Sequence, residues 1–128
     1  MTYFKKTILP IFLIGVWINI SMTIAWLLIL ESYWVDKYQS LNLIFPSGLT
    51  INIMWMIWGF MFAIIIFILS KKYSLLQTTL LSWFVTFVVP WNMIWTMGVL
   101  PTGMLLFNIP NTLFMTFIGA VISKKLNN

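Results

Sequence analysis

The sequence predicts an all-α integral membrane protein, a bundle of four transmembrane helices with both termini in the cytoplasm. Hydrophobic residues make up 62% of the chain and charged residues only 7%, whereas about 25% of the residues of a soluble domain are charged. The apolar residues fall into four runs, each long enough to cross a bilayer, which takes about 20 residues. The lysines lie mainly in pairs at the ends of these runs. A soluble domain has no room beside the four spans, so residues 1–128 are expected to form a single membrane domain with spans at about 7–30, 50–70, 74–97 and 102–123.

The first span begins after Lys5 and Lys6. A secretory signal peptide has a shorter apolar region of about 7–15 residues and a small-x-small cleavage site. The run 7–30 is longer and ends in bulky residues before Glu31, so we expect a retained span. Gly15 and Asn19 are four residues apart and share a helix face, and small or hydrogen-bonding residues of this kind favour contact with another helix over contact with lipid.

The connection 31–49 follows, and its composition is more polar. Trp34, Tyr38 and Leu41 recur at helical spacing within it, while the polar residues fall on other faces. This pattern predicts a short amphipathic helix that lies in the headgroup region, in the first extracytoplasmic loop.

The second span contains a small-xxx-small pair. Gly59 and Ala63 are four residues apart, in one row with Trp55 and Phe67. Small residues at this spacing let another helix backbone approach closely. The second span is therefore expected to pack through Gly59 and Ala63.

The third and fourth spans are nearly mirror images about Leu100. Pro90 and Pro110 each lie ten residues from it, which is about 15 Å along a helix and half the thickness of the hydrocarbon core. Each proline removes an N–H donor, which frees the carbonyl of Thr86 in one helix and of Leu106 in the other. Such carbonyls need partners in lipid, so the sequence predicts a kinked, polar centre at mid-membrane.

Polar side chains gather at the same depth. Asn92 and Asn108 stand roughly 12 Å from the turn, and Asn111 and Thr112 follow on the fourth span. One interpretation is structural: Asn and Thr join helices, at about 0.6 kcal/mol for each hydrogen bond. The other is a cavity for a neutral ligand. The structural interpretation is favoured. If the centre is instead a cavity for a neutral ligand, the candidate ligand-binding residues are Asn19, Asn92, Asn108, Asn111, Thr86 and Thr112. The expected helix-packing positions are Gly15, Gly59, Ala63, Pro90 and Pro110.

The distribution of charge predicts the orientation. Lysine pairs stand at the N-terminus, after the second span and at the C-terminus, all on one side of a four-span protein. The positive-inside rule places this side in the cytoplasm. The expected location is therefore the inner (plasma) membrane of a bacterial-type cell, with several spans, and the expected partners are the lipid bilayer and either further copies of the chain or a larger membrane protein. Paired lysines at helix ends do not indicate nucleic-acid binding.

Several kinds of chemistry are excluded. The chain has no Cys, no His and no Arg, so thiol chemistry, Cys or His metal ligation and a Ser-His-Asp triad are absent. No charged residue lies within the four spans, which disfavours an ion-coupled pump. No cofactor, metal site or catalytic residue is therefore expected.

Three function classes remain. The first is a binding or transport bundle for a neutral or apolar small molecule. The second is an accessory subunit that packs against a larger membrane complex. The third, ranked last, is a lipid-modifying enzyme that uses Glu31 and Asp36 as an acid and base pair. These two residues are five apart, which does not place them on one face of a regular helix.

Overall fold

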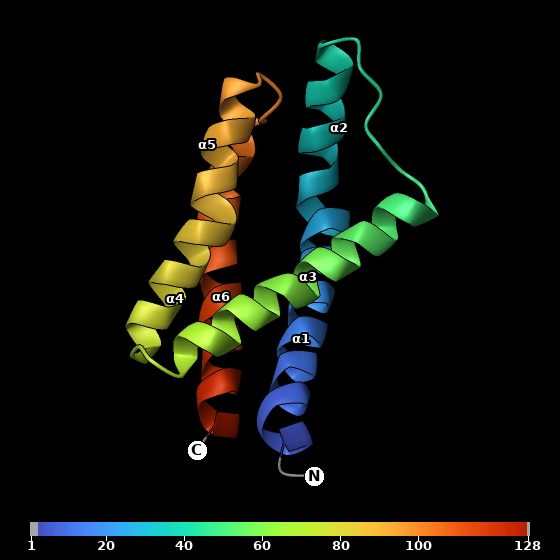
Figure 1. The fold of residues 1–128 in the computed structure, drawn as a ribbon. Coiled ribbons are helices and arrows are strands. Elements are labelled where there is room, and N and C mark those ends of the chain that lie inside the picture. The colour runs from blue at the N-terminus through green and yellow to red at the C-terminus, as the bar shows by residue number, and fades with distance from the viewer. Residues whose placement is uncertain (1–2, 128) are drawn as a thin grey trace.

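The chain folds entirely into helices in the computed structural model (Figure 1), which describes residues 3–127, and that range contains no strand. Three helices are long and apolar enough to cross a membrane: Phe4–Ser40, Leu49–Ser70 and Thr102–Leu126. The helix 75–96 is not among them, because Gln77, Asn92 and several Thr and Ser residues make it more polar. The segments in chain order are η1 (Phe4–Ile8), α1 (Leu9–Ala25), η2 (Trp26–Leu30), α2 (Glu31–Ser40), α3 (Leu49–Ser70), α4 (Leu75–Trp83), η3 (Phe84–Val88), α5 (Val89–Thr96), η4 (Thr102–Met104) and α6 (Leu105–Asn127).

The first helix does not end near residue 30, where the sequence predicted the end of the first span. The segment 31–40 is helical as expected, but it continues directly from α1 through η2 as one helix of 37 residues, and α2 extends the direction of α1 (Figure 1). Nothing between Ala25 and Ser40 stops a helix, because that stretch contains neither Pro nor Gly. The helix ends at Ser40. Asn42, two residues later, adopts φ 60°, and the N–H of Leu43 donates to the carbonyl of Tyr38 at 2.9 Å. This pairing is a Schellman-type C-terminal cap.

Local signals in the sequence also determine the other helix ends. Ser74 begins α4 with a capping box: its hydroxyl accepts from the N–H of Gln77 at 3.2 Å, and Gln77 accepts in return from the N–H of Ser74 at 3.1 Å. Gly98 follows α5 at φ 79°, a conformation that glycine adopts without strain. The turn between α5 and α6 packs inward through Leu100, which is buried.

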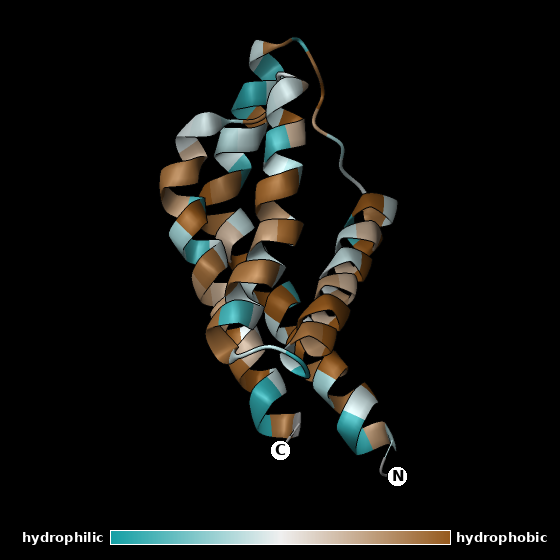
Figure 2. Cartoon of the chain, turned by 60° about the vertical axis from the view of Figure 1, so that its left-hand side comes forward, coloured by the Kyte–Doolittle hydropathy of each residue, from teal (hydrophilic) through white to brown (hydrophobic). Residues whose placement is uncertain are grey.

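The four long helices form a bundle in which α6 contacts α1, α3 and α4. α3 runs obliquely across the others and lies against α4 at its C-terminal end, while its N-terminal half points away from α5 (Figure 1). Hydrophobic residues dominate the middle of the helices, and hydrophilic residues lie mostly toward the ends (Figure 2). The main core contains Ile14, Ile18, Phe62, Ile66 and Met115, which are all fully or almost fully buried.

The close contact between α1 and α3 depends on glycine. A Cβ atom at Gly15 would lie against the ring of Phe60, and one at Gly59 would lie 2.7 Å from Nδ2 of Asn19. Ala63, one turn after Gly59, is completely buried. The two helices therefore approach at positions where a larger residue would not fit, as small residues allow in membrane bundles.

Replacing Gly59 by Leu should destabilise the bundle. The added side chain must displace Asn19 from α1, and overpacking of this kind typically costs about 1–3 kcal/mol. The thermal unfolding midpoint in detergent measures this change. Met54→Leu, at an exposed position of the same helix, is the control and should leave the midpoint unchanged. Equal midpoints for the two variants would contradict this account of the contact.

Candidate functional site

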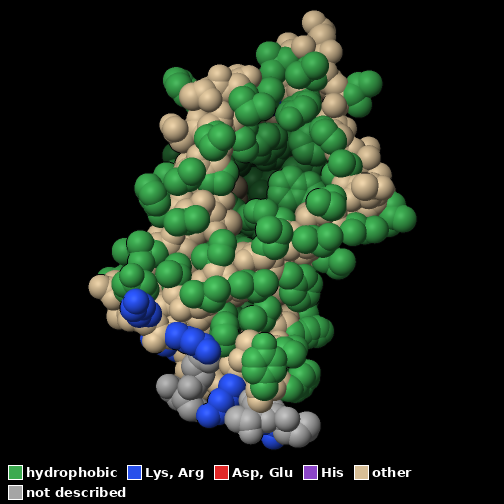
Figure 3. Space-filling model, viewed as in Figure 1, with side chains coloured by type: hydrophobic (Ala, Val, Ile, Leu, Met, Phe, Trp, Pro, Cys, Tyr) green, Lys and Arg blue, Asp and Glu red, His purple; other side chains and the backbone are tan. Residues whose placement is uncertain are grey.

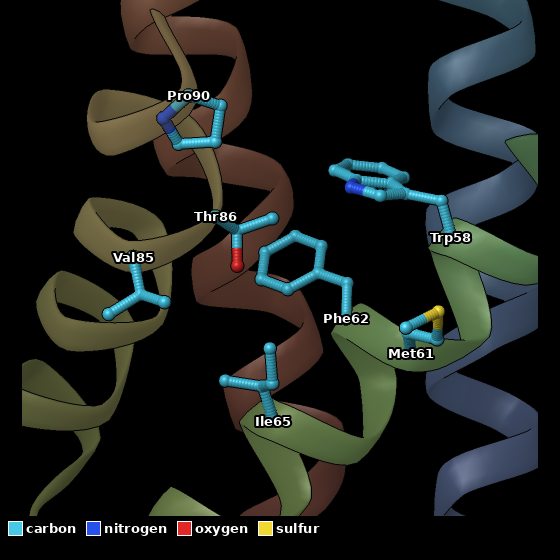
Figure 4. A pocket seen from close by; sticks show the side chains of 7 residues that line it. All are labelled: Trp58, Met61, Phe62, Ile65, Val85, Thr86 and Pro90. Atoms are coloured by element: carbon cyan, nitrogen blue, oxygen red, sulfur yellow. The ribbon is translucent and has the colours of Figure 1, made fainter. Parts of the chain in front are cut away.

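A pocket of about 200 Å³ opens between α3 and the helix that contains η3 and α5. Four of its lining residues come from α3 and three from η3 and α5, and in Figure 4 Phe62 and Thr86 face one another across it. Figure 3 shows that this face of the molecule is hollowed and that hydrophobic side chains surround the hollow. The pocket is lined by Trp58, Met61, Phe62, Ile65, Val85, Thr86 and Pro90.

Packed aromatic rings form one wall of the pocket. Phe87 makes edge-on contacts with Trp58 and Phe62, with ring centroids 5.5 Å apart in both pairs, and its ring lies 5.6 Å from that of Trp91. Aromatic pairs in this distance range contribute about 0.5–1.5 kcal/mol beyond the burial of their area. The wall is therefore fixed by contacts that do not depend on a ligand.

Buried polar residues line the interface between α4 and α6 behind the pocket. The indole N–H of Trp83 donates to the hydroxyl of Thr112 at 2.9 Å, which sets the register of the two antiparallel helices. Thr112 in turn donates to the carbonyl of Asn108 at 2.7 Å. The interface contains Thr78, Thr79, Ser82 and Thr86 from one helix and Asn108, Thr112 and Thr116 from the other, all buried.

Four buried polar atoms in the described part of the chain have no hydrogen-bond partner. They are Oγ of Ser82, Oγ1 of Thr86, Oδ1 of Asn108 and Nδ2 of Asn111. An unsatisfied buried group costs about 1–3 kcal/mol. Of the four residues, Thr86 also lines the pocket, although its hydroxyl oxygen itself is buried.

The structure does not bring the four candidate asparagines together. Asn19 lies between α1 and α3, where its Nδ2 donates to the carbonyls of Gly15 at 2.8 Å and Met56 at 3.4 Å. Asn92 is exposed on α5. Asn108 and Asn111 lie within α6, and no hydrogen bond joins any two of the four in the described range. These positions fit the structural interpretation of Asn19 and leave Asn108 and Asn111 without a partner.

The two prolines are accommodated differently. Pro90 follows the π-helical segment η3, in which the N–H of Val89 donates to the carbonyl of Phe84, five residues back. This change in hydrogen-bond spacing is one way in which helices adjust to proline. Pro110 lies inside the continuous helix α6, where the hydroxyl of Thr112 binds the carbonyls of Asn108 and Ile109.

The acidic pair does not form a site with the pocket. Glu31 and Asp36 are both exposed on the helix formed by η2 and α2, and Glu31 accepts from the indole N–H of Trp26 at 3.2 Å. Residues 3–127 contain no group of three or more metal-ligating side chains. No ionisable side chain lines the pocket, so its lining offers apolar contact and hydrogen bonding, with no acid, base or charged nucleophile.

Sequence reasoning missed most of the pocket. Trp58, Met61, Phe62 and Ile65 lie in a span that is apolar on every face, so no hydrophobic periodicity distinguishes the side that faces the pocket. Thr86 is the one lining residue among the predicted ligand-binding residues. The sequence signal was Pro90, which removes the helical donor to the Thr86 carbonyl. Two tryptophans outside the pocket lining join helices instead: Trp17 donates to the carbonyl of Met115 at 2.9 Å, and Trp83 donates to the hydroxyl of Thr112.

Comparison of the chain with protein-family models, curated proteins and solved structures found no match.

A double-mutant cycle should detect the bond between Trp83 and Thr112. Trp83→Phe and Thr112→Val each remove one partner, and the coupling energy between them should be about 0.6 kcal/mol, with about 1.7 as the upper limit seen in a membrane bundle. The measured quantity is the free energy of unfolding in detergent. Thr96→Val, at an exposed position near the end of α5, should combine additively with Trp83→Phe. Additivity of the first pair as well would show that the bond contributes nothing.

Proposed function

We propose that the chain crosses a bacterial-type plasma membrane four times, with both termini in the cytoplasm, and binds a neutral apolar small molecule in the pocket between α3 and α5. The positions of the lysines support the orientation. Lys71 and Lys72 follow α3, and Lys124 donates to the carbonyl of Tyr73 in the same turn at 2.6 Å. The basic side chains visible in Figure 3 lie at one end of the bundle, as the positive-inside rule expects of a cytoplasmic side, whereas Lys37 lies on α2.

The packing of the helix 75–96 supports a fourth span. A helix of this length extends about 33 Å, enough to cross the hydrocarbon core of roughly 30 Å. Thr78, Ser82 and Thr86 are buried against the rest of the bundle. Gln77 and Asn92 are exposed, together with apolar residues that include Leu76, Leu80 and Phe84. The residues that this helix exposes to lipid are therefore more apolar, on average, than the helix as a whole.

The length of the first helix implies that part of it leaves the membrane. Its 37 residues extend about 55 Å, well beyond a hydrocarbon core of roughly 30 Å. α2, with its polar face and both acidic residues, then projects on the extracytoplasmic side. Phe45 folds back onto α2 and packs against Tyr38, with ring centroids 4.9 Å apart, which fastens the connection to the helix.

The pocket is the observation that carries the binding function. Its wall is aromatic and aliphatic, and neither a charge nor an ion pair lies in it. A cavity of about 150 Å³ lined by apolar side chains binds benzene, whereas pockets for drug-sized ligands start at about 300 Å³. With about 200 Å³, the pocket fits a single ring or a short branched hydrocarbon segment.

The orientation can be tested with single cysteines, because the chain has none of its own. Gln39→Cys and Tyr73→Cys should react with a membrane-impermeant maleimide from opposite sides of sealed vesicles, Tyr73→Cys from the cytoplasmic side. Both positions are exposed. Labelling of both from the same side would contradict the four-span topology.

The binding function can be tested with methylcyclohexane as the probe. At ten times its dissociation constant it should stabilise the wild-type protein by about 1.4 kcal/mol, measured as a rise in the unfolding midpoint in detergent. Ile65→Trp fills part of the pocket and should abolish the rise. Ile68→Trp, one turn along α3 at an exposed position, should retain it. A wild-type midpoint that does not respond to the probe would refute the function.

A further inference from the structure

Two lysine pairs that are far apart in the sequence meet at one end of the bundle. Ser70 ends α3, and its hydroxyl pairs with that of Ser123 on α6 at 2.5 Å, with both side chains buried. One lysine pair follows directly after Ser70 and the other directly after Ser123. The bond between the serines therefore brings the two pairs onto neighbouring helix ends. We call these four residues the basic cluster: Lys71, Lys72, Lys124 and Lys125.

No carboxylate compensates the charge of the basic cluster. The chain has two acidic residues, Glu31 and Asp36. Both lie on α2, at the opposite end of the bundle from the last residues of α3 and α6 (Figure 1). Like charges repel one another at short range. An anion that binds between the two helix ends therefore meets four cations and no acidic side chain.

Contacts hold one lysine of each pair in position. The Nζ atom of Lys124 donates to the carbonyl of Tyr73 at 2.6 Å, and the Nζ atom of Lys71 lies 4.5 Å from the ring centroid of Phe67. An ammonium group has three donors, so Lys124 keeps two of them for a further acceptor. Lys71 is exposed and donates no hydrogen bond within the described residues. The basic cluster thus presents unused donors from two helices.

Exposed apolar side chains adjoin the basic cluster. Ile68 lies three residues before Lys71 on α3, Leu76 lies in the first turn of α4, and both are exposed. The lysines follow the apolar part of each helix, so they stand at the level of the headgroups when the helices span a membrane, and Ile68 and Leu76 stand just inside the hydrocarbon region. A molecule with an anionic head and an apolar chain contacts both surfaces, whereas free phosphate contacts only the lysines.

We propose that the basic cluster binds the headgroup phosphate of an anionic phospholipid, whose acyl chains lie along Ile68 and Leu76. Lys71 and Lys124 donate to the phosphate oxygens, and the other two lysines add to the attraction. Clustered lysines at the ends of membrane helices bind anionic lipids in this way. The basic cluster is separate from the pocket, so the inference goes beyond the proposed function and holds whether or not the pocket binds a ligand.

The test compares two lipids with the same acyl chains, the anionic dioleoylphosphatidylglycerol and dioleoylphosphatidylcholine, which has no net charge. Each is titrated into the whole chain in a neutral detergent, and its apparent dissociation constant is obtained from the rise in the unfolding midpoint. A lysine near an anionic surface contributes a factor of about five, so Lys71 and Lys124 together should give a preference of about 25-fold for the anionic lipid. Lys71→Gln and Lys124→Gln should each lower it to about fivefold.

Lys37→Gln is the matched control. It removes the same charge from α2, outside the basic cluster, so the preference should stay at about 25-fold. The preference compares two lipids on one protein, and a variant that is merely less stable therefore keeps it. An equal loss in Lys37→Gln and Lys71→Gln would assign the effect to net charge and overturn the site, as would a wild-type protein without a preference.

Inorganic phosphate separates the lipid headgroup from free phosphate as the ligand. The two lipids are titrated again in sodium phosphate and in sodium chloride at equal ionic strength, so that screening of the charges is the same. The preference for the anionic lipid should be equal in the two salts. A preference that disappears only in phosphate would show that the basic cluster takes free phosphate, and would overturn the assignment to a lipid.

Discussion

The bundle depends on hydrogen bonds from the other helices to α6. Trp17 of α1 donates to the carbonyl of Met115, Trp83 of α4 donates to Thr112, and Ser70 of α3 pairs with Ser123 at 2.5 Å. In a bilayer the hydrophobic effect does not draw apolar helices together, because lipid tails are as apolar as the side chains. Specific bonds and close packing must therefore select the arrangement. These three bonds attach α1, α3 and α4 to successive positions along one helix.

The pocket follows from a conflict between two packing requirements of α3. Gly15 and Gly59 bring α3 tightly against α1, and the buried pair Ser70 and Ser123 holds its C-terminal end at α6. A straight helix that satisfies both contacts runs obliquely and diverges from α5 toward its N-terminal end (Figure 1). Trp58 and Phe62 fill part of the resulting gap by packing on Phe87, and the remaining space is the pocket. Its position is thus set by contacts outside it.

Pro90 lies beside the pocket in a helix whose local hydrogen bonding is irregular. The proline removes a donor from the helix, and the preceding segment η3 adopts π-helical spacing. Thr86 lies within that segment and makes no bond to the preceding turn, in contrast to Thr79 in the regular helix α4.

The sequence by itself determined the helical class, the approximate ends of the apolar helices and the places of the special residues. These features depend on local chemistry, because each affects only residues that are close to it in the sequence. Examples are the apolar runs, the capping box at Ser74, the glycine after α5 and the missing N–H of Pro90. The continuity of α1 with α2, the separation of Asn19 and Asn92 from Asn108, and the pocket were decided only by the tertiary structure. In a helix that is apolar on all faces, the residue types of Trp58, Phe62 and Ile65 do not indicate which face of the helix packs inward. The crossing of α3 over its neighbours decides which of its faces is exposed and which lines the pocket, because the crossing angle depends on contacts between residues far apart in the chain.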